Sequence, residues 1–356
     1  MNARADHRKT VQYELLLGRE ASEAMRRCPV AYLPIGCLER HGDHLPMGLD
    51  VMAALGSERA RHHLLDTYHE DRFENYVSQL DSVTTKLARM TDEDWRGNAL
   101  LQWLYALKLN LNPIAKFGKG AAVPLFVRSR AYADKTLMTA CGSWAELHRD
   151  VILYSKEMYV EYGGMPPPPP KHQAYVEPKP DVFREVALMS DQLSRHLSEM
   201  QVAGEPTIKA CDELAEVSRT LARIAEDELD GLNPSEKDVE YCHRVGRSLG
   251  SIISGLARDT SDEVWLTKNQ SPEPMAVVAD VATDPNKDQV LEVAVGNPCK
   301  LYALIPFYGK TYIAVGGCFS YYEFPKPVYE RMTDEEWRAL DPKPPMPEWT
   351  RSLVRR

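Results

Sequence analysis

Apolar residues recur at two different spacings along this chain. Through most of its length they return every three or four positions, which places them on one face of an α-helix. Segments with this helical spacing cover residues 51–90, 91–112, 143–162, 181–201, 214–224 and 242–256. The pattern therefore predicts a body made mainly of helices, with a soft break near His69.

These helical segments carry start and stop signals. Thr91, with an acidic residue three positions later, is typical of a capping box, and Thr333 is expected to cap a last short helix. Asn112-Pro113 should end the second segment, because proline cannot continue a helix. In the turn between two later helices, Gly231 provides a stop and Asn233 is the predicted N-cap.

Near Pro272 the spacing changes from helical to alternating. The segments 275–284, 288–296, 300–306 and 310–324 are rich in Val, Ile and Tyr, as β-strands are. The turn at 307–310 should join the last two as a hairpin. We therefore predict an α+β protein that is predominantly α-helical, with a small C-terminal antiparallel β-sheet and an N-terminal truncated α/β fragment.

The composition is that of an ordinary globular protein. Of the 356 residues, 44% are hydrophobic and 27% are charged, with a net charge of −9. Lys and Arg are dispersed, which argues against a nucleic-acid partner. No apolar run reaches the roughly 18–20 residues of a membrane span, and the N-terminus has no signal-peptide core. We predict a cytoplasmic protein without membrane contact.

One short stretch, "AYLPIGCLERHGDHLPMGLDV", concentrates metal-ligating residues. Glu39 and His41 point to the same side of an extended backbone. A tight turn through Gly42, Pro46 and Gly48 would bring Asp50 back to meet them. One imidazole and two carboxylates suit Zn²⁺ or Mn²⁺. His44 would then be available for catalytic acid–base work.

This stretch resembles the metal-binding signature of the creatininase family of amidohydrolases. The matching residues are Gly36, Glu39, His41, Gly42, His44, Leu45, Pro46 and Asp50, with Arg40 in place of the usual glutamine. The resemblance implies that Glu39, His41 and Asp50 are ligands of a two-metal centre that hydrolyses a linear or cyclic amide. The His and Glu segment that completes this site in the family is missing from the chain.

A second group could supply the missing ligands. Glu58, His62 and Asp66 follow one another at four-residue spacing, with His69 three positions later, so they share a helix face. If that helix folds back, Glu58, His62 and His69 would supplement the metal site. The alternative is a solvent-exposed helix face with ordinary ion pairs.

A third candidate lies between Trp144 and Lys156. His148, with Asp150 nearby, would act as a general base, and Tyr154 or Lys156 as an acid. Residues two apart on a helix do not face each other, however. The alternative is a half-buried interface helix.

Most of the chain resembles an uncharacterised prokaryotic family, domain of unknown function 3160. The resemblance extends from about Gly48 to Trp349 and rests on "GLDVMAALGSERA", "GSWAELHRDVILYSKEMY", "YVEPKPDVFREVA", "VADVATDP" and "GGCFSYYEFPKP". The family usually has L-R-H-D where this chain has Leu147-His148-Arg149-Asp150, which weakens a role for His148. Its members tend to be longer than this chain and exported.

The two resemblances meet near residue 50 and define the predicted domains. Residues 1–50 form a creatininase-like fragment, and residues 51–349 form the family body. The body divides into helices (51–258), an antiparallel sheet (272–325) and a C-terminal helix and tail (333–356). Such a junction suggests gene fusion, truncation or an assembly error.

Two functions follow from this sequence. The first is a helical domain without a complete catalytic site, in which the metal-binding signature is a remnant and no cofactor is needed. The second is a creatininase-type amidohydrolase that uses Zn²⁺ or Mn²⁺ and a small-molecule amide. The sequence favours the first, because three ligands on an unsupported loop would bind a metal weakly.

Overall fold

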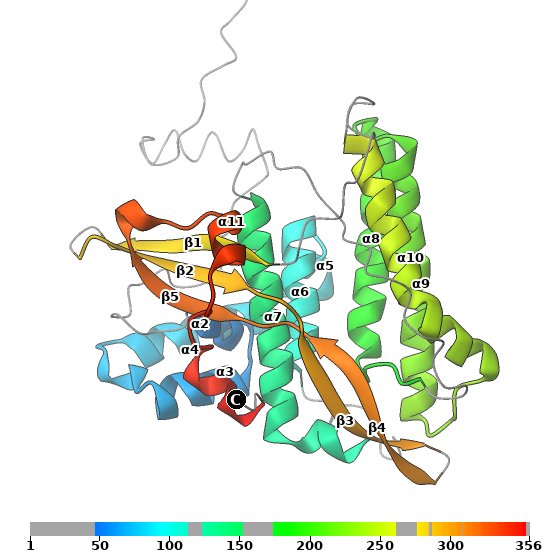
Figure 1. Cartoon of the computed structure of the whole chain (residues 1–356), viewed down its shortest axis with the longest axis horizontal. Coiled ribbons are helices and arrows are strands. Elements are labelled where there is room, and N and C mark those ends of the chain that lie inside the picture. The colour runs from blue at the N-terminus through cyan, green and yellow to red at the C-terminus, as the bar shows by residue number, and fades with distance from the viewer. Residues whose placement is uncertain are drawn as a thin grey trace, which may run out of the picture. The chain divides into compact units, whose positions relative to one another are not determined.

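A computed structural model describes residues 47–112, 123–151, 174–260, 276–284, 287–307 and 309–353 (Figure 1). The chain divides into two compact units, Met1–Cys37 and Leu38–Arg356, and every described residue belongs to the second. The predicted N-terminal α/β fragment therefore lies largely outside the described residues.

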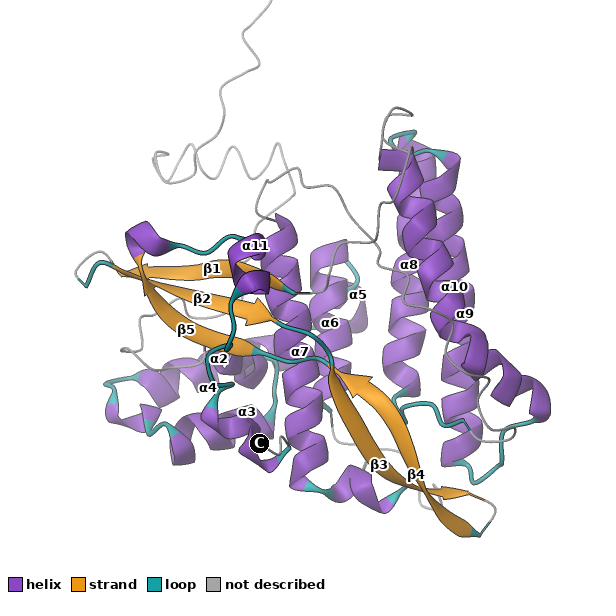
Figure 2. Cartoon of the chain, viewed as in Figure 1, coloured by secondary structure: helices purple, strands orange, loops and turns teal. Residues whose placement is uncertain are grey.

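Helices dominate the described part of the chain, and a small amount of antiparallel sheet lies near its C-terminal end (Figure 2). The α-helices are α2 (Met47–Ala54), α3 (Glu58–His62), α4 (Tyr76–Ala88), α5 (Asp92–Trp95), α6 (Ala99–Leu111), α7 (Arg130–Val151), α8 (Pro180–Met200), α9 (Glu205–Leu229), α10 (Glu236–Thr260) and α11 (Asp334–Ala339). Short turns of other helix types are η3 (His63–Thr67), η4 (Glu70–Arg72), η6 (Leu125–Arg128), η8 (Val328–Glu330) and η9 (Glu348–Ser352). The predicted fold class is confirmed.

The strands form two antiparallel sheets, not one. They are β1 (Val277–Asp284), β2 (Gln289–Val295), β3 (Cys299–Phe307), β4 (Lys310–Cys318) and β5 (Tyr322–Pro327), in the orders β1-β2-β5 and β3-β4. The hairpin at 307–310 is confirmed, because Phe307 pairs with Lys310. The single strand predicted over 310–324 is wrong: the chain leaves one sheet after Cys318 and joins the other at Tyr322. Alternating apolar residues continue across this gap, so the local pattern hides the change of sheet.

Local hydrogen bonds explain several of the described helix ends. Thr91 and Thr333 both form capping boxes, as predicted. Helix α6 ends at Leu111, directly before the predicted stop. The predicted cap at Asn233 is wrong, because the amide nitrogen of Asp238 donates to Ser235 Oγ (3.2 Å) at the start of α10. Serine is as good an N-cap as asparagine, so the sequence allowed either position.

The segment 51–90 is more broken than its spacing suggests. Helix α2 ends at Ala54, and Gly56 (φ 99°) turns the chain before α3 begins. The predicted break near His69 is confirmed, because His69 has φ 56° between η3 and η4. Of the tight turn predicted through Gly42, Pro46 and Gly48, the structure describes Gly48 alone, and this residue lies inside α2. Glycine is needed there for another reason: a Cβ on Gly48 would lie 2.6 Å from Tyr321 Oη.

Helix α7 organises the core. It contacts β1 and β2 of the three-stranded sheet, and also α2, α3, α6 and η9. Its side chains Leu137, Met138 and Cys141 are fully buried. Figure 1 shows α7 between that sheet and α6, while α8, α9 and α10 pack together as a bundle in which α8 contacts α6. Helix α7 begins at Arg130, well before the start at residue 143 that the apolar spacing predicted.

Candidate functional site

The structure describes one of the three predicted metal ligands. Asp50 lies in α2 and is 5% exposed. The Tyr76 hydroxyl donates a 2.5 Å hydrogen bond to Asp50 Oδ1. Glu39, His41 and His44 lie outside the described residues. The carboxylate of Asp50 is therefore held within the helical core, and its role as a metal ligand stays a prediction.

The proposed supplementary ligands lie on the surface. His62 Nδ1 pairs with Asp66 Oδ2 one turn later, and both side chains are exposed. Glu58 and His69 are exposed as well. Within the described ranges, no three His, Cys, Asp or Glu side chains are grouped so that they could hold a metal ion. Glu58, His62 and Asp66 lie on α3 and η3, whereas His69 follows η3 with φ 56° and does not share their helix face. Their role as supplementary ligands stays a prediction.

His148 is half-buried on α7. Its ring packs edge-on against the buried Trp144, with 4.5 Å between ring centroids, and burial lowers the pKa of His148. The neighbouring Arg149 donates from Nη2 to Asp334 Oδ2 (3.1 Å) and so connects α7 to α11. The general-base role of His148 stays a prediction, because its expected partners Asp150, Tyr154 and Lys156 have no described side-chain positions.

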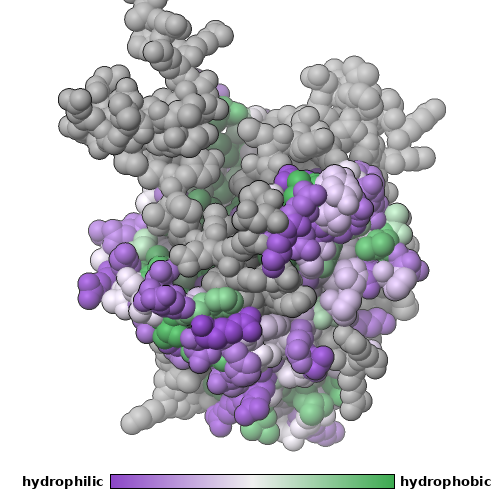
Figure 3. All heavy atoms as spheres, turned by 90° about the vertical axis from the view of Figure 1, so that its left-hand side faces the viewer, coloured by the Kyte–Doolittle hydropathy of each residue, from purple (hydrophilic) through white to green (hydrophobic). Residues whose placement is uncertain are grey.

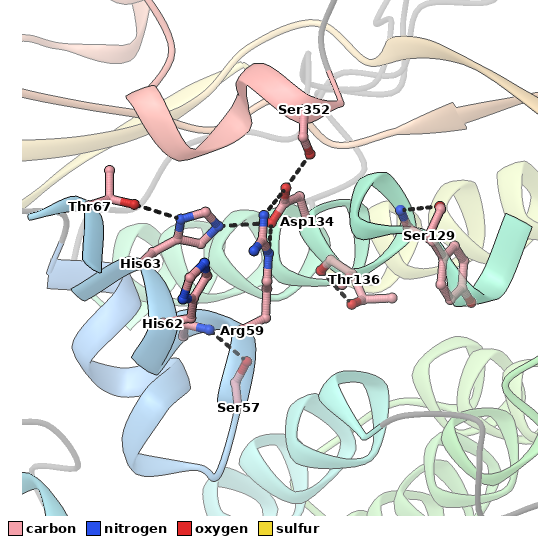
Figure 4. Close-up of polar contacts among 12 residues, drawn as sticks. Ser57, Arg59, His62, His63, Thr67, Ser129, Asp134, Thr136 and Ser352 are labelled. Carbon is pink, nitrogen blue, oxygen red and sulfur yellow. Dashed lines mark hydrogen bonds and ion pairs between the residues drawn. The ribbon is translucent and has the colours of Figure 1, made fainter. Parts of the chain in front are cut away.

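The sequence did not suggest a polar cluster that lies where α3, η3, α7 and η9 meet. It surrounds Asp134 of α7, which is 0% exposed (Figure 4). Arg59 donates to both carboxylate oxygens, from Nε (2.6 Å) and Nη2 (2.8 Å). His63 Nε2 donates to Oδ1 (2.9 Å), and Ser352 Oγ donates to Oδ2. One buried carboxylate thus connects α3, η3, α7 and η9.

Electrostatics keep this carboxylate ionised. Burial alone would raise the pKa of Asp134, but hydrogen bonds from His63, Arg59 and Ser352 outweigh burial and lower the pKa to about 2. His63 and Ser352 both contact Asp134, and no hydrogen bond is found between them. The cluster is therefore not arranged as a nucleophile–base pair.

A change of helix type separates the two neighbouring histidines. The chain switches from α-helix at His62 to a π-turn over His63–Thr67, and π-turns occur often at functionally important positions. His62 faces solvent, whereas the buried His63 places Nδ1 3.3 Å from Thr67 Oγ1. An analysis of regular helical spacing selects His62, whose carboxylate partner Asp66 lies four residues later, and misses His63, whose partner Asp134 lies 71 positions away in the chain.

Other buried charged residues also connect elements of the fold. Glu185 of α8 accepts from Arg96 Nη2 (2.8 Å) and from Gln102 Nε2 (3.0 Å). The ammonium group of Lys179 donates to the backbone carbonyl of Asn110 (2.6 Å), near the end of α6. Such contacts satisfy buried charges by packing helices together, which is an architectural use of ionisable groups.

The outer face of the β3–β4 hairpin is the other unusual feature of the described surface. Tyr302 and Leu304 of β3 lie directly opposite Val315 and Ile313 of β4. These four side chains are 65%, 58%, 63% and 67% exposed, respectively. We call them the ribbon face. The remaining residues with the same side-chain direction, Lys300, Pro306, Thr311 and Gly317, are also exposed.

The opposite face of this hairpin is turned inward. Ile305 and Cys318 are buried, β3 contacts η6, and β4 contacts α7. An antiparallel ribbon with one buried face ordinarily has polar residues on the other. On another side of the molecule, by contrast, hydrophobic residues occur in small groups among hydrophilic ones (Figure 3). The ribbon face is therefore an exposed apolar surface of the kind that marks interaction sites.

Comparison with known protein families agrees with the larger of the two resemblances. Residues 37–350 match the family described as "Protein of unknown function (DUF3160)". The chain belongs to this family. No curated protein and no solved structure matches the DUF3160 chain. The creatininase resemblance stays a prediction.

The family match extends further toward the N-terminus than the predicted start near Gly48. It begins at residue 37, so Glu39, His41 and His44 lie inside the matched region of the DUF3160 chain. Among its described helices, none combines the length and apolar character that a bilayer span requires. A cytoplasmic location, like the absence of a nucleic-acid partner, remains a prediction.

Proposed function

We propose that the DUF3160 chain is a protein-binding domain and that the ribbon face is its docking surface. The observation that carries this proposal is the exposure of Tyr302, Leu304, Ile313 and Val315 on one face of a two-stranded ribbon. Water contact at all four positions is unfavourable, and a partner that covers them removes it.

The size of this surface suggests a modest contribution to binding. Covering each side chain contributes roughly 1 to 2 kcal/mol, because each is about two-thirds exposed at the start. Association itself costs at least about 4 kcal/mol in lost freedom of motion. The ribbon face would therefore act as the apolar centre of a larger contact, surrounded by polar interactions.

The buried charged residues support a non-catalytic function. Asp134, Glu185 and Lys179 are each bonded to neighbouring elements of the fold. A catalytic acid or base has to reach a substrate, whereas these groups are occupied in holding helices together. This favours binding over chemistry within the described body.

Site-specific cross-linking tests the proposal. A photo-crosslinking amino acid at Thr311, which is exposed on the same side as the ribbon face, should give a discrete cross-linked protein in the cells that produce the chain. Leu304→Thr combined with Ile313→Thr should abolish that product, because it removes apolar surface without changing charge. Gel electrophoresis followed by mass spectrometry measures the product.

A matched control uses another exposed leucine. Leu232 is 60% exposed between α9 and α10, so Leu232→Thr removes similar apolar surface elsewhere and should leave the cross-link unchanged. If the ribbon variant still forms the same product, or if Leu232→Thr removes it equally, the ribbon face is not the docking surface.

A metal-dependent amidohydrolase is the second candidate function. The observation in its favour is that the Glu39–Asp50 signature lies within the region that matches the family. If it binds Zn²⁺ or Mn²⁺, the purified chain should retain about one or two equivalents after dialysis. The Glu39→Ala/His41→Ala double variant should lose them, as measured by mass spectrometry. Metal content that the double variant does not alter would show that the signature is a remnant.

A further inference from the structure

Two cysteines lie directly opposite each other at the base of the β3–β4 hairpin. Cys299 is the first residue of β3, Cys318 is the last residue of β4, and the register of the two strands pairs them. Both are free thiols, and Cys318 is 7% exposed while Cys299 is half-buried. The fold therefore brings together two thiols that are far apart in the sequence.

The pairing places the two side chains close to the geometry of a disulfide. Directly opposite residues on antiparallel strands point to the same face, with Cα atoms and Cβ atoms each about 4.5–5.5 Å apart. Disulfides have Cα atoms about 4.4–6.8 Å apart and Cβ atoms about 3.5–4.5 Å apart. Because Cys299 and Cys318 form the last pair of the ribbon, strands can approach there without disturbing ladder pairs on both sides.

The other described cysteines are placed differently. Cys141, Cys211 and Cys242 lie on the helices α7, α9 and α10, respectively. Cys242 packs against the cluster that contains Ile224, which lies about 20 Å along α9 from Cys211. Among the cysteines that the structure describes, a shared strand register thus joins Cys299 and Cys318 alone.

This pair lies where the ribbon joins the three-stranded sheet. Strand β2 ends at Val295, shortly before Cys299, and β5 begins at Tyr322, shortly after Cys318. Both connections between the two sheets therefore lead directly to the cysteine pair. A covalent bond at this position would hold the base of the ribbon closed.

We infer that Cys299 and Cys318 form a redox-sensitive modification site, at which a low-molecular-weight disulfide such as oxidised glutathione generates a cross-strand disulfide. The thiolate of the half-buried Cys299 attacks one sulfur of the small disulfide and displaces one thiol. The thiolate of Cys318 then attacks the Cys299 sulfur and displaces the second thiol. The two cysteines lose two protons and two electrons, and the small disulfide is reduced to two thiols.

Burial sets the rate of this exchange. It raises the pKa of Cys299 and of Cys318. At Cys318 the charge of Lys135 and a hydrogen bond with Thr139 oppose the rise in pKa, and the charge of Glu177 adds to it. The thiolate is the attacking species, so disulfide formation should be about tenfold faster at pH 8 than at pH 7.

The disulfide should restrict opening of the ribbon. It closes a loop, residues 299–318, that contains all of the hairpin, and it prevents the two strands from separating at their base. Amide hydrogens of residues 300–306 and 311–317 should therefore exchange about tenfold more slowly in the oxidised chain than in the reduced chain. Hydrogen-exchange mass spectrometry measures this difference, and it does not require a binding partner.

Peptide mapping of the full chain tests the inference. The folded chain is incubated with oxidised glutathione, the remaining thiols are blocked with N-ethylmaleimide, and the product is digested with trypsin. Cleavage after Lys287, Lys300, Lys310 and Arg331 should give peptides 288–300 and 311–331, joined by a disulfide. Mass spectrometry identifies the joined peptides, and dithiothreitol should separate them.

Three variants identify the thiols involved. Cys299→Ser should abolish the joined peptides and the slower hydrogen exchange. Cys318→Ala should instead retain glutathione on Cys299, because the second thiol that displaces it is missing. Cys211→Ser is the matched control on α9 and should behave like the unmodified chain. Circular dichroism verifies that each variant is folded.

Three results would overturn the inference. The first is a folded, unmodified chain that keeps glutathione on Cys299 or stays fully reduced, without the joined peptides. The second is formation of the joined peptides only after unfolding in urea, which would show that the folded ribbon does not pair the thiols. The third is equal hydrogen exchange in the oxidised and reduced chains, which would show that the bond does not control the ribbon.

Discussion

At the scale of single residues, the buried Asp134 forms a set of contacts that no sequence pattern predicted. Its carboxylate accepts hydrogen bonds from Arg59, His63 and Ser352 in a site without solvent contact. Removing one partner of a buried ion pair is costly, because the remaining charge is left without compensation. Asp134 should therefore contribute strongly to the stability of this family fold.

The variant Asp134→Asn should lower the free energy of unfolding by about 3 kcal/mol. Urea unfolding followed by circular dichroism measures this change. Asp66→Asn is the matched control, because Asp66 pairs with His62 on the exposed surface, and such pairs contribute about 0–1 kcal/mol. If the two substitutions lower the free energy of unfolding equally, the buried cluster around Asp134 does not contribute strongly to stability.

The same carboxylate makes stability depend on pH in the acid range. The pKa of Asp134 is lowered from 3.8 to about 2, so the folded protein binds this proton less readily than the unfolded chain does. The contribution of Asp134 to the free energy of unfolding is therefore complete above pH 4 and is lost as pH falls toward 2. Urea unfolding should show that the free energies of unfolding of the unmodified chain and of Asp134→Asn come closer together as pH falls from 4 to 2.

Glu228 should produce the opposite dependence near neutral pH. Burial raises the pKa of this carboxyl from 4.5 to about 8, although the amide of Val176 donates to it. Asp227 and Asp238 add negative charge nearby and raise the pKa further. The folded protein then holds a proton that the unfolded chain releases, so stability falls as pH rises from 4.5 to 8.

The variant Glu228→Gln tests this dependence because glutamine cannot ionise. At pH 8.5 the variant should be more stable than the unmodified chain by a few kcal/mol, on the order of 3, and the two should differ little at pH 4.5. Urea unfolding at both values gives the comparison. If the variant and the unmodified chain differ in free energy of unfolding by the same amount at both pH values, Glu228 does not titrate in this range.

At the scale of elements, α2 depends on a close approach to Tyr321. A Cβ on Gly48 would lie 2.6 Å from Tyr321 Oη and 3.2 Å from Cys141 Sγ, both of which are buried. Gly48→Ala should therefore destabilise the protein by about 1–3 kcal/mol through overpacking, although alanine favours the helix. Thermal melting measures the effect.

Gly246 of α10 provides the opposite case. An added Cβ there meets no atom within 4 Å, so Gly246→Ala should raise stability by roughly 0.5–1 kcal/mol through helix propensity alone. The two substitutions make the same chemical change in a helix. A stabilising effect at both positions would mean that α2 does not pack against Tyr321 as described.

At the scale of the whole molecule, the proposed docking role requires that the ribbon face contribute little to folding. Leu304→Thr/Ile313→Thr should change the free energy of unfolding by less than about 1 kcal/mol, because both side chains are mostly exposed. The variant should also aggregate less in light scattering at high concentration. A larger loss of stability would indicate that these side chains pack within the chain.

Local chemistry made much of the fold predictable. The caps at Thr91 and Thr333 depend on hydrogen bonds between residues three positions apart, so the sequence alone identified them. Apolar spacing likewise predicted a mainly helical body and a hairpin at 307–310, since each helix or hairpin is formed by neighbouring residues. The sequence by itself determined these elements because their stabilising partners lie nearby in the chain.

Tertiary structure decided the rest. Asp134 meets Ser352 and His63 from distant parts of the chain, and no local spacing links them. The division of residues 310–324 between two sheets depends on which strands are available to pair. Likewise, β3 and β4 have apolar residues on both faces, so only the packing of η6 and α7 against one side leaves the ribbon face exposed.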